Sequence, residues 1–113
     1  MDHLPIFINI RKKPCIVIGG GDIALRKINL LLKAQAMVDC LSPSFSRDIK
    51  NLSKDGHITL INKSFDQTDI KDYSIIIAAT DDSSVNSSIC AIAQVKKIPV
   101  NVVDSPELSS FIM

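Results

Sequence analysis

The run from Gly19 to Ala24, GGGDIA, has the residue types and spacing of a phosphate-binding turn. In the pattern G-x-G-x-x-A, Gly19 would make the tight turn, Gly21 would let the backbone approach a pyrophosphate, and Ala24 would let a helix pack closely on the preceding strand. The free N–H groups and positive dipole of that helix would then face the phosphates. Glycine clusters also end strands without binding anything, so the run alone leaves a dinucleotide site and a plain turn open.

Strands and helices alternate on both sides of this turn. Apolar, β-branched runs and apolar residues at helical spacing predict five strands and three helices. The strands are expected at 15–18, 38–41, 58–61, 74–80 and 99–103. The first helix is expected at 23–36, and the second is expected to begin at Pro43, with Ser42 as its N-cap. The third is expected to be capped by residues 81–84 and to end at Lys96 and Lys97. Residues 5–10 are expected to be extended, and residues 64–73 to form a loop with at most a short helical turn.

This alternation with short links predicts an α/β, Rossmann-like fold. It would be one domain over residues 1–113, with a parallel sheet in the order 3-2-1-4-5 and helices on both faces. Ligands in such a sheet bind beyond the carboxyl ends of the strands. Four loops would converge there: the glycine turn, with contacts through the backbone of Asp22 and Ile23, and the loops beginning at Ser42, Thr80 and Asp104. Thr80 could touch a nicotinamide ribose.

The end of the second strand bears on the choice between NAD and NADP. An acid there normally binds the adenosine ribose 2′-hydroxyl, but this strand ends in Ser42-Pro43-Ser44, and Asp39 lies inside it. Ser42 or Ser44 could bond a ribose or could simply cap the next helix. The nearest downstream cation is Arg47, so no strong site for a 2′-phosphate is evident. These residues leave NAD and NADP open.

Asp104 is the candidate for acid–base chemistry. It follows a buried strand at the ligand-binding edge, where partial desolvation would make its carboxylate a stronger base. The alternative is a loop cap in front of Ser105 and Pro106, and the sequence leaves the two interpretations even. Asp81 and Asp82 are expected to cap the helix that follows them.

Composition excludes several classes of protein. A net charge of +1, with four phenylalanines and one tyrosine, excludes the basic, aromatic surface of a nucleic-acid-binding protein. The apolar runs are too short to span a membrane and the N-terminus lacks a signal peptide, so a cytoplasmic protein is expected. Three cysteines in apolar contexts predict buried, reduced thiols. With only two histidines, the spacing predicts no transition-metal site.

Four motifs in the correct order resemble a known family. They are the opening MDHLPIF, the glycine turn followed by Arg26-Lys27, the segment AATDD at 78–82 followed by Val85-Asn86, and the segment NVVD at 101–104. Together they resemble the N-terminal precorrin-2 dehydrogenase/sirohydrochlorin ferrochelatase part of siroheme synthase, from Met1 to Met113. The opening heptad is similar to that of the multifunctional bacterial type, which also carries a C-terminal uroporphyrinogen-III methyltransferase.

The resemblance implies NAD⁺-dependent oxidation of precorrin-2 to sirohydrochlorin, followed by insertion of the substrate Fe²⁺ to give siroheme. It makes Asp104 the catalytic aspartate, taking a proton during oxidation and assisting chelation, and it places cofactor contacts at Asp22-Ile23 and Pro43-Ser44. It also implies a homodimer for the full-length enzyme. A tetrapyrrole rich in carboxylates would attract cations, so the basic clusters at 11–13, 26–27 and 96–97, otherwise expected to be solvated surface charges, become candidates.

Two departures from the family pattern and two alternative functions stand beside this resemblance. Gln35 replaces a usual glycine at the end of the first helix, which would cost about 1 kcal/mol if that position needs a positive φ. The chain stops at Met113, before the family's helical dimerisation segment, so the piece is expected to bind NAD but to be poorly active. A non-catalytic dinucleotide-sensing module, and a domain for FAD or S-adenosylmethionine, share the glycine turn and stay open.

Overall fold

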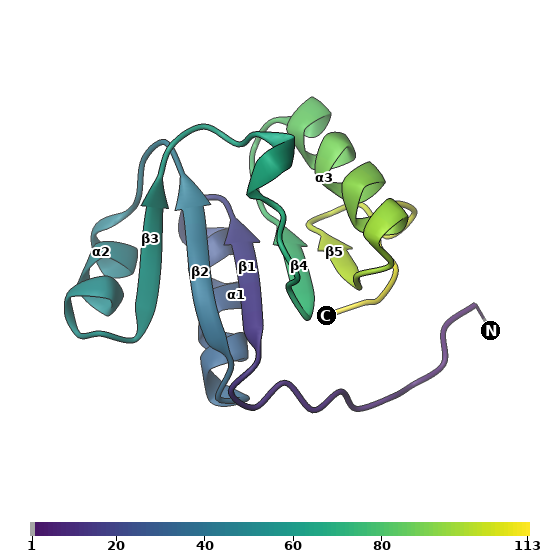
Figure 1. The fold of residues 1–113 in the computed structure, drawn as a ribbon, viewed down its shortest axis with the longest axis horizontal. Helices are drawn as coiled ribbons and strands as arrows, with labels where there is room; N and C mark the ends of the chain where they lie inside the picture. Colours follow the sequence, from purple (N-terminus) through teal and green to yellow (C-terminus); the bar gives the residue numbers. More distant parts are fainter. Residues whose placement is uncertain (1) are drawn as a thin grey trace.

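The computed structural model describes residues 2–113, and Met1 of the opening motif lies outside the described residues. Five parallel strands form one sheet in the order β3-β2-β1-β4-β5 (Figure 1). The strands are β1 (Pro14–Ile18), β2 (Met37–Ser42), β3 (Ile58–Asn62), β4 (Ile75–Ala78) and β5 (Val100–Val102). The predicted Rossmann-like fold and strand order are confirmed.

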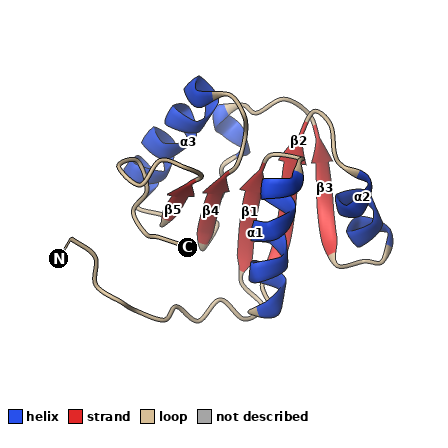
Figure 2. Cartoon of the chain, turned by 180° about the vertical axis from the view of Figure 1, so that it is seen from behind, coloured by secondary structure: helices blue, strands red, loops and turns tan. Residues whose placement is uncertain are grey.

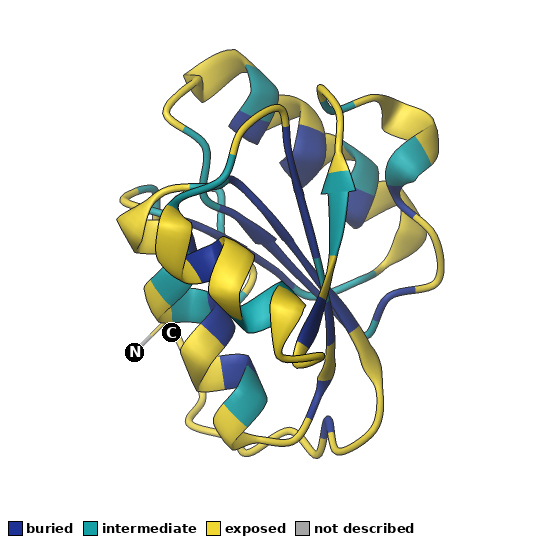
Figure 3. Ribbon diagram, turned by 90° about the vertical axis from the view of Figure 1, so that its left-hand side faces the viewer, coloured by how far each residue is buried: buried dark blue, intermediate teal, exposed yellow. Residues whose placement is uncertain are grey.

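Helices cover both faces of the sheet, as predicted (Figure 2). One face packs on α1 (Asp22–Lys33) and α2 (Arg47–Lys54), and the other packs on α3 (Ser83–Lys96). A short 3-10 helix, η1 (Gln67–Asp69), lies on the α3 side within the predicted loop. Coloured by burial, the strands form a buried layer between helices whose outer faces are exposed (Figure 3).

The position of β1 in the middle of the sheet explains why residues 15–18 are continuously apolar. Cys15 and Val17 point into the layer of α1 and α2, whereas Ile16 and Ile18 point into the layer of α3. All four residues are buried because both faces of the strand are covered. The thiols are free and buried, as predicted, and burial raises the pKa of Cys15 to about 11.

The segment before β1 is the part of the chain that packs least. Residues 5–10 are extended, as predicted, but they pair with no strand, and Figure 1 shows the segment running past the lower edge of the sheet. Leu4, Ile6 and Phe7 are exposed, and Ile10 is the first buried side chain. The sheet therefore begins at β1. Within residues 2–113, no helix is long and apolar enough to cross a membrane.

The second helix begins later than predicted. Its N-cap is Ser46, whose hydroxyl accepts a hydrogen bond from Ile49 N, and not Ser42. Ser42 is the last residue of β2, and Ser46 N donates to the carbonyl of Gly20 at 2.8 Å. This hydrogen bond holds the loop after β2 against the glycine turn as far as Ser46. The helix therefore begins at Arg47, after the loop has passed the turn.

The first helix also ends earlier than the predicted residue 36, with Ala34 as its C-cap. Gln35 follows in the left-handed region at φ 63°, where glycine is favoured. Its carbonyl accepts a hydrogen bond from Lys12 N at 2.8 Å, which ties this turn to the start of β1. Gln35 therefore has the positive φ for which a cost of about 1 kcal/mol is expected.

Replacing Gln35 with glycine is expected to raise the free energy of unfolding by about 1 kcal/mol, because glycine has no side chain to strain at positive φ. Urea denaturation measures the change. The matched control is Lys33→Gly at the last residue of α1, which is expected to lower stability by up to about 0.7 kcal/mol. Equal destabilisation by both substitutions would contradict the strain assigned to Gln35.

Candidate functional site

The loops that follow β1, β2, β4 and β5 meet at one edge of the sheet. Hydrogen bonds tie them there: Gly19 N donates to Leu41 O at 2.9 Å, Ala79 N donates to Ile18 O at 2.8 Å, and Val103 N donates to Ala78 O at 3.0 Å. The glycine turn and Asp104 therefore lie on the same rim, as the parallel topology predicts.

Each glycine of the turn has a different surrounding. Gly19 has φ +139°, and a Cβ there would lie 2.3 Å from the carbonyl oxygen of Ala79. A Cβ on Gly20 would lie 1.9 Å from the carbonyl oxygen of Ser44. Gly21 has nothing within 4 Å of that position. The first two glycines let neighbouring loops approach, whereas Gly21 faces open space, as expected where a ligand is to approach the backbone.

The helix that starts at this turn is the one among the three α-helices with no side-chain cap. Gly21 is its N-cap residue and supplies no side-chain acceptor. In contrast, Ser46 caps α2, and Asp82 caps α3 by accepting hydrogen bonds from Ser84 N and Val85 N. The first N–H groups of α1 therefore keep their capacity to bind an acceptor, and the helix dipole favours an anionic one.

A cavity of about 740 Å³ opens beside the turn, and we call it the glycine-turn cleft. Seven of the eight predicted cofactor contacts line it: Gly21, Asp22, Ile23, Ser42, Pro43, Ser44 and Thr80. The eighth, Gly19, lies beneath it, against Ala79. Its described lining includes no lysine or arginine. These residues therefore lie at one cleft, and their contact with a cofactor stays a prediction.

The end of β2 presents hydroxyl groups to this cleft and no carboxylate. Ser42 is buried, and its Oγ accepts a hydrogen bond from Ser44 N at 3.4 Å. Asp39 belongs to a separate environment, as expected, because its Oδ2 accepts a hydrogen bond from the Tyr73 hydroxyl at 2.7 Å. Burial and this hydrogen bond raise the pKa of Tyr73.

The loop after β4 is held by a network around Asn86. The Thr80 hydroxyl lies 2.6 Å from Asn86 Oδ1, and Asn86 Nδ2 donates to the Thr80 carbonyl at 3.1 Å. Asp82 is the N-cap of α3, as predicted, and its hydrogen bonds to Ser84 and Val85 lower its pKa. Thr80 is thus a positioned residue of the cleft, with its hydroxyl already bonded within the loop.

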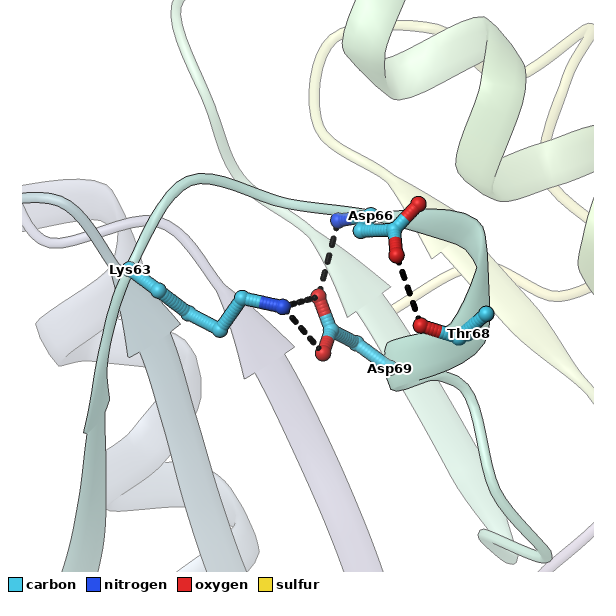
Figure 4. Close-up of polar contacts among 4 residues, drawn as sticks. All are labelled: Lys63, Asp66, Thr68 and Asp69. Carbon is cyan, nitrogen blue, oxygen red and sulfur yellow. Dashed lines mark hydrogen bonds and ion pairs between the residues drawn. The ribbon is translucent and has the colours of Figure 1, made fainter.

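The segment after β3 contributes Ser64 and Phe65 to the lining of the same cleft, and the residues around them form polar contacts (Figure 4). Lys63 Nζ pairs with Asp69 Oδ1 at 2.7 Å, and Asp66 N donates to Asp69 Oδ2 at 2.8 Å. The Thr68 hydroxyl donates to Asp66 Oδ2 at 2.6 Å and lowers the pKa of Asp66. These bonds close η1 and hold the adjoining Phe65 at the cleft wall.

Asp104 lies in a second cavity, of about 470 Å³, which we call the Asp104 hollow. Ile23, at the start of α1, lines both this hollow and the glycine-turn cleft. Arg26 and Lys27 line the hollow from α1, and residues 101–106 line it from β5 and the loop after it. The two cavities are therefore neighbours on one rim and share one side chain.

The Asp104 side chain is exposed, so the predicted partial desolvation is wrong for this carboxylate. The cause is that β5 ends two residues earlier, and residues 103–104 turn outward, with Ser105 N bonded to Val102 O at 3.1 Å. Asp104 has φ 58°, a left-handed conformation that aspartate tolerates better than most residues. Within residues 2–113 its carboxylate takes part in no ion pair.

Comparison with protein families places the fold. A family model described as "Putative NAD(P)-binding" matches residues 6–113. The chain belongs to this NAD(P)-binding family. A solved structure entitled "SirC, precorrin-2 dehydrogenase" superposes on 98% of the chain and 54% of its own, with a TM-score of 0.77 and 23% identity. That likeness shows the same fold.

Curated relatives of this NAD(P)-binding chain are named siroheme synthases. The protein from Ruthia magnifica subsp. Calyptogena magnifica is 50% identical over 113 residues, which is the whole of this chain. The protein from Nitrosomonas europaea is 46% identical over 114 residues, and siroheme synthase 2 of Pectobacterium atrosepticum is 43% identical over 113. The chain spans 24% of the length of the first two relatives.

The sequence did not single out three residues that shape the site of this NAD(P)-binding domain. Gly20 lets the loop after β2 approach, Asn86 holds Thr80, and Phe65 lines the cleft wall. Gly20 and Asn86 lay within the motifs that carried the family resemblance, which was the available signal. Phe65 carried none, because its role depends on the fold of the segment after β3.

Proposed function

We propose that this chain is the NAD-binding dehydrogenase domain of a siroheme-forming enzyme, and that within the full-length enzyme it oxidises precorrin-2 to sirohydrochlorin. One observation carries the proposal beyond the fold: an open, uncapped glycine turn and a free carboxylate occupy neighbouring cavities on the same rim. The siroheme synthase relatives and the precorrin-2 dehydrogenase fold are consistent with this chemistry.

The composition of the glycine-turn cleft favours NAD over NADP. Its described lining holds no lysine or arginine for a 2′-phosphate, and it includes Asp22, Asp81 and Asp82. The hydroxyl groups of Ser42 and Ser44 are suited to a ribose. The open space at Gly21 and the uncapped start of α1 suit a pyrophosphate. The residues present therefore fit the dinucleotide.

The proposed reaction removes one hydride and one proton from the macrocycle. Bound NAD⁺ supplies the hydride acceptor. The backbone of Asp22 and Ile23 would hold the pyrophosphate at the start of α1, and Thr80 would contact the nicotinamide ribose from the loop after β4. The Asp104 carboxylate accepts the proton at one of its oxygens, on the neighbouring side of Ile23. The domain thus separates cofactor binding from proton transfer while keeping both on one rim.

Ferrochelation is a further part of the proposal for the full-length enzyme, with Fe²⁺ as a substrate and Asp104 accepting pyrrole protons. Within residues 2–113 there is no cluster of three metal-ligating side chains. We also propose a homodimer for the full-length enzyme.

The test uses the full-length parent protein. Titration of NAD⁺, NADP⁺, FAD and S-adenosylmethionine against thermal stability is expected to raise the melting temperature with NAD⁺ alone. NAD⁺ reduction at 340 nm is then expected on addition of precorrin-2. Stabilisation by NAD⁺ without oxidation would favour a dinucleotide-sensing module, and stabilisation by FAD or S-adenosylmethionine alone would overturn the cofactor assignment.

A further inference from the structure

The Asp104 hollow is lined by two cations, Arg26 and Lys27, which the proposed proton transfer to Asp104 does not use. We infer that Arg26 and Lys27 bind acidic side chains of the tetrapyrrole substrate and thereby position its ring over Asp104. This inference rests on the proposed function and assigns a substrate-binding site within it.

The two cations belong to one face of α1. Ile23, Arg26, Lys27 and Leu30 follow the spacing i, i+3, i+4, i+7, which places them on one side of a helix, and all four line the hollow. Ile23 and Leu30 are 37% and 46% exposed, which is unusual for large apolar side chains on a helix with its own buried face. This face therefore offers apolar surface and positive charge together.

Within residues 2–113, Arg26 and Lys27 form no ion pair with an acidic side chain. The ion pair found among residues 2–113 joins Lys63 and Asp69, far from α1 in the sequence. Lys27 Nζ donates to the backbone oxygen of Met113 at 3.3 Å, and Arg26 is exposed. Asp104 is the one carboxylate that lines the described hollow. Counted by side chains, the hollow holds two cations against one carboxylate.

The fold separates this cluster from the other two basic clusters. Residues 11–13 precede β1, and residues 96–97 end α3 before β5, so both lie at the amino ends of parallel strands. Asp104 and the glycine turn follow the carboxyl ends. The three clusters look alike in sequence, but only 26–27 shares a cavity with Asp104 in the described structure.

The chemistry of the proposed ligand matches this surface. A tetrapyrrole presents an apolar ring edge and several carboxylate side chains, which suit Ile23 and Leu30 on one hand and the cations on the other. A guanidinium group can hold a carboxylate through two parallel hydrogen bonds, so Arg26 would fix orientation as well as supply charge. A ring held at α1 would lie between the glycine-turn cleft and Asp104, because Ile23 lines both cavities.

The experiment compares Arg26→Gln, Lys27→Gln and Arg26→Lys with the wild type in the full-length protein. Each glutamine variant is expected to raise both the KM for precorrin-2 and the Kd for sirohydrochlorin about tenfold, with kcat within about twofold. The Kd for NAD⁺ and the melting temperature are expected to stay unchanged. Arg26→Lys is expected to lose less affinity than Arg26→Gln, since it keeps the charge but not the bidentate geometry.

The matched control is Lys96→Gln, which removes one exposed cation from the opposite rim and is expected to leave all of these constants unchanged. Unchanged tetrapyrrole affinity in both glutamine variants would overturn the inference. Weaker NAD⁺ binding in place of weaker tetrapyrrole binding would also overturn it, because the cations would then serve the cofactor. Binding of sirohydrochlorin is measured apart from turnover. If Arg26→Gln weakens sirohydrochlorin binding but the wild type does not oxidise precorrin-2, the proposed reaction is refuted and this inference is supported.

Discussion

Asp104→Asn is expected to lower kcat for precorrin-2 oxidation by about 10²- to 10⁴-fold, the range for losing a general base. Asparagine keeps the size of the side chain and accepts the left-handed backbone that Asp104 adopts at φ 58°. It cannot take the proton. The Kd for NAD⁺ is expected to stay unchanged, because Asp104 lies outside the glycine-turn cleft. Stopped-flow measurement of NADH formation and a thermal-shift titration give the two quantities.

The control for this substitution is Glu107→Gln. Glu107 is an exposed carboxylate three residues along the same loop, and it does not line the described hollow. Removing its charge is expected to leave kcat unchanged. Equal loss of activity in both variants would point to the charge of the loop and not to a base at Asp104. An unchanged kcat in Asp104→Asn would end the assignment of Asp104 as the base.

The sheet could be predicted because its signals are local. Ile16, Ile18 and Ile76 belong to continuous apolar runs, which are typical of strands buried on both faces. Parallel connection then places every strand's carboxyl end on one edge, so the meeting of Gly21 with Ser42 and Thr80 follows from topology alone. No side-chain detail was needed for that result.

The details that could not be predicted depend on contacts between distant segments. The sequence favours Ser42 as the N-cap of α2, with Pro43 at the first helical position, but Ser46 is the N-cap in the structure, where its N–H bonds to Gly20 O. The exposure of Asp104 depends on an outward turn after β5, which apolar periodicity does not report. Sequence reasoning therefore gathered the candidate residues at one edge of the sheet but did not predict that they divide between two cavities.

That division has a functional consequence. The glycine-turn cleft is lined by three carboxylates and no described lysine or arginine, whereas the hollow beside it holds Arg26 and Lys27 together with Asp104. Substitutions in the two cavities should accordingly separate cofactor affinity from proton transfer and tetrapyrrole affinity. Ile23 is the exception, because it lines both.

Gly21→Ala is expected to raise the Kd for NAD⁺ at least tenfold, a loss of about 1.4 kcal/mol or more, while the fold is retained. The added methyl group would project into the open space of the cleft, where nothing lies within 4 Å. It would therefore occupy the room through which a pyrophosphate reaches the start of α1. Loss of the glycine N-cap is expected to cost no more than about 1 kcal/mol of stability. Isothermal titration calorimetry and urea denaturation measure the two effects.

Gly20→Ala separates the effect on binding from an effect on folding. Its Cβ would lie 1.9 Å from the backbone carbonyl of Ser44, so the loop after β2 must move, at a cost of about 1–3 kcal/mol in unfolding free energy. If Gly21→Ala destabilised the protein as much as Gly20→Ala, Gly21 would be a structural glycine. If Gly21→Ala bound NAD⁺ as the wild type does, the dinucleotide could not approach along this turn. If a pyrophosphate binds at Gly21, Gly21→Ala is expected to keep the stability of the protein and to lose affinity for NAD⁺.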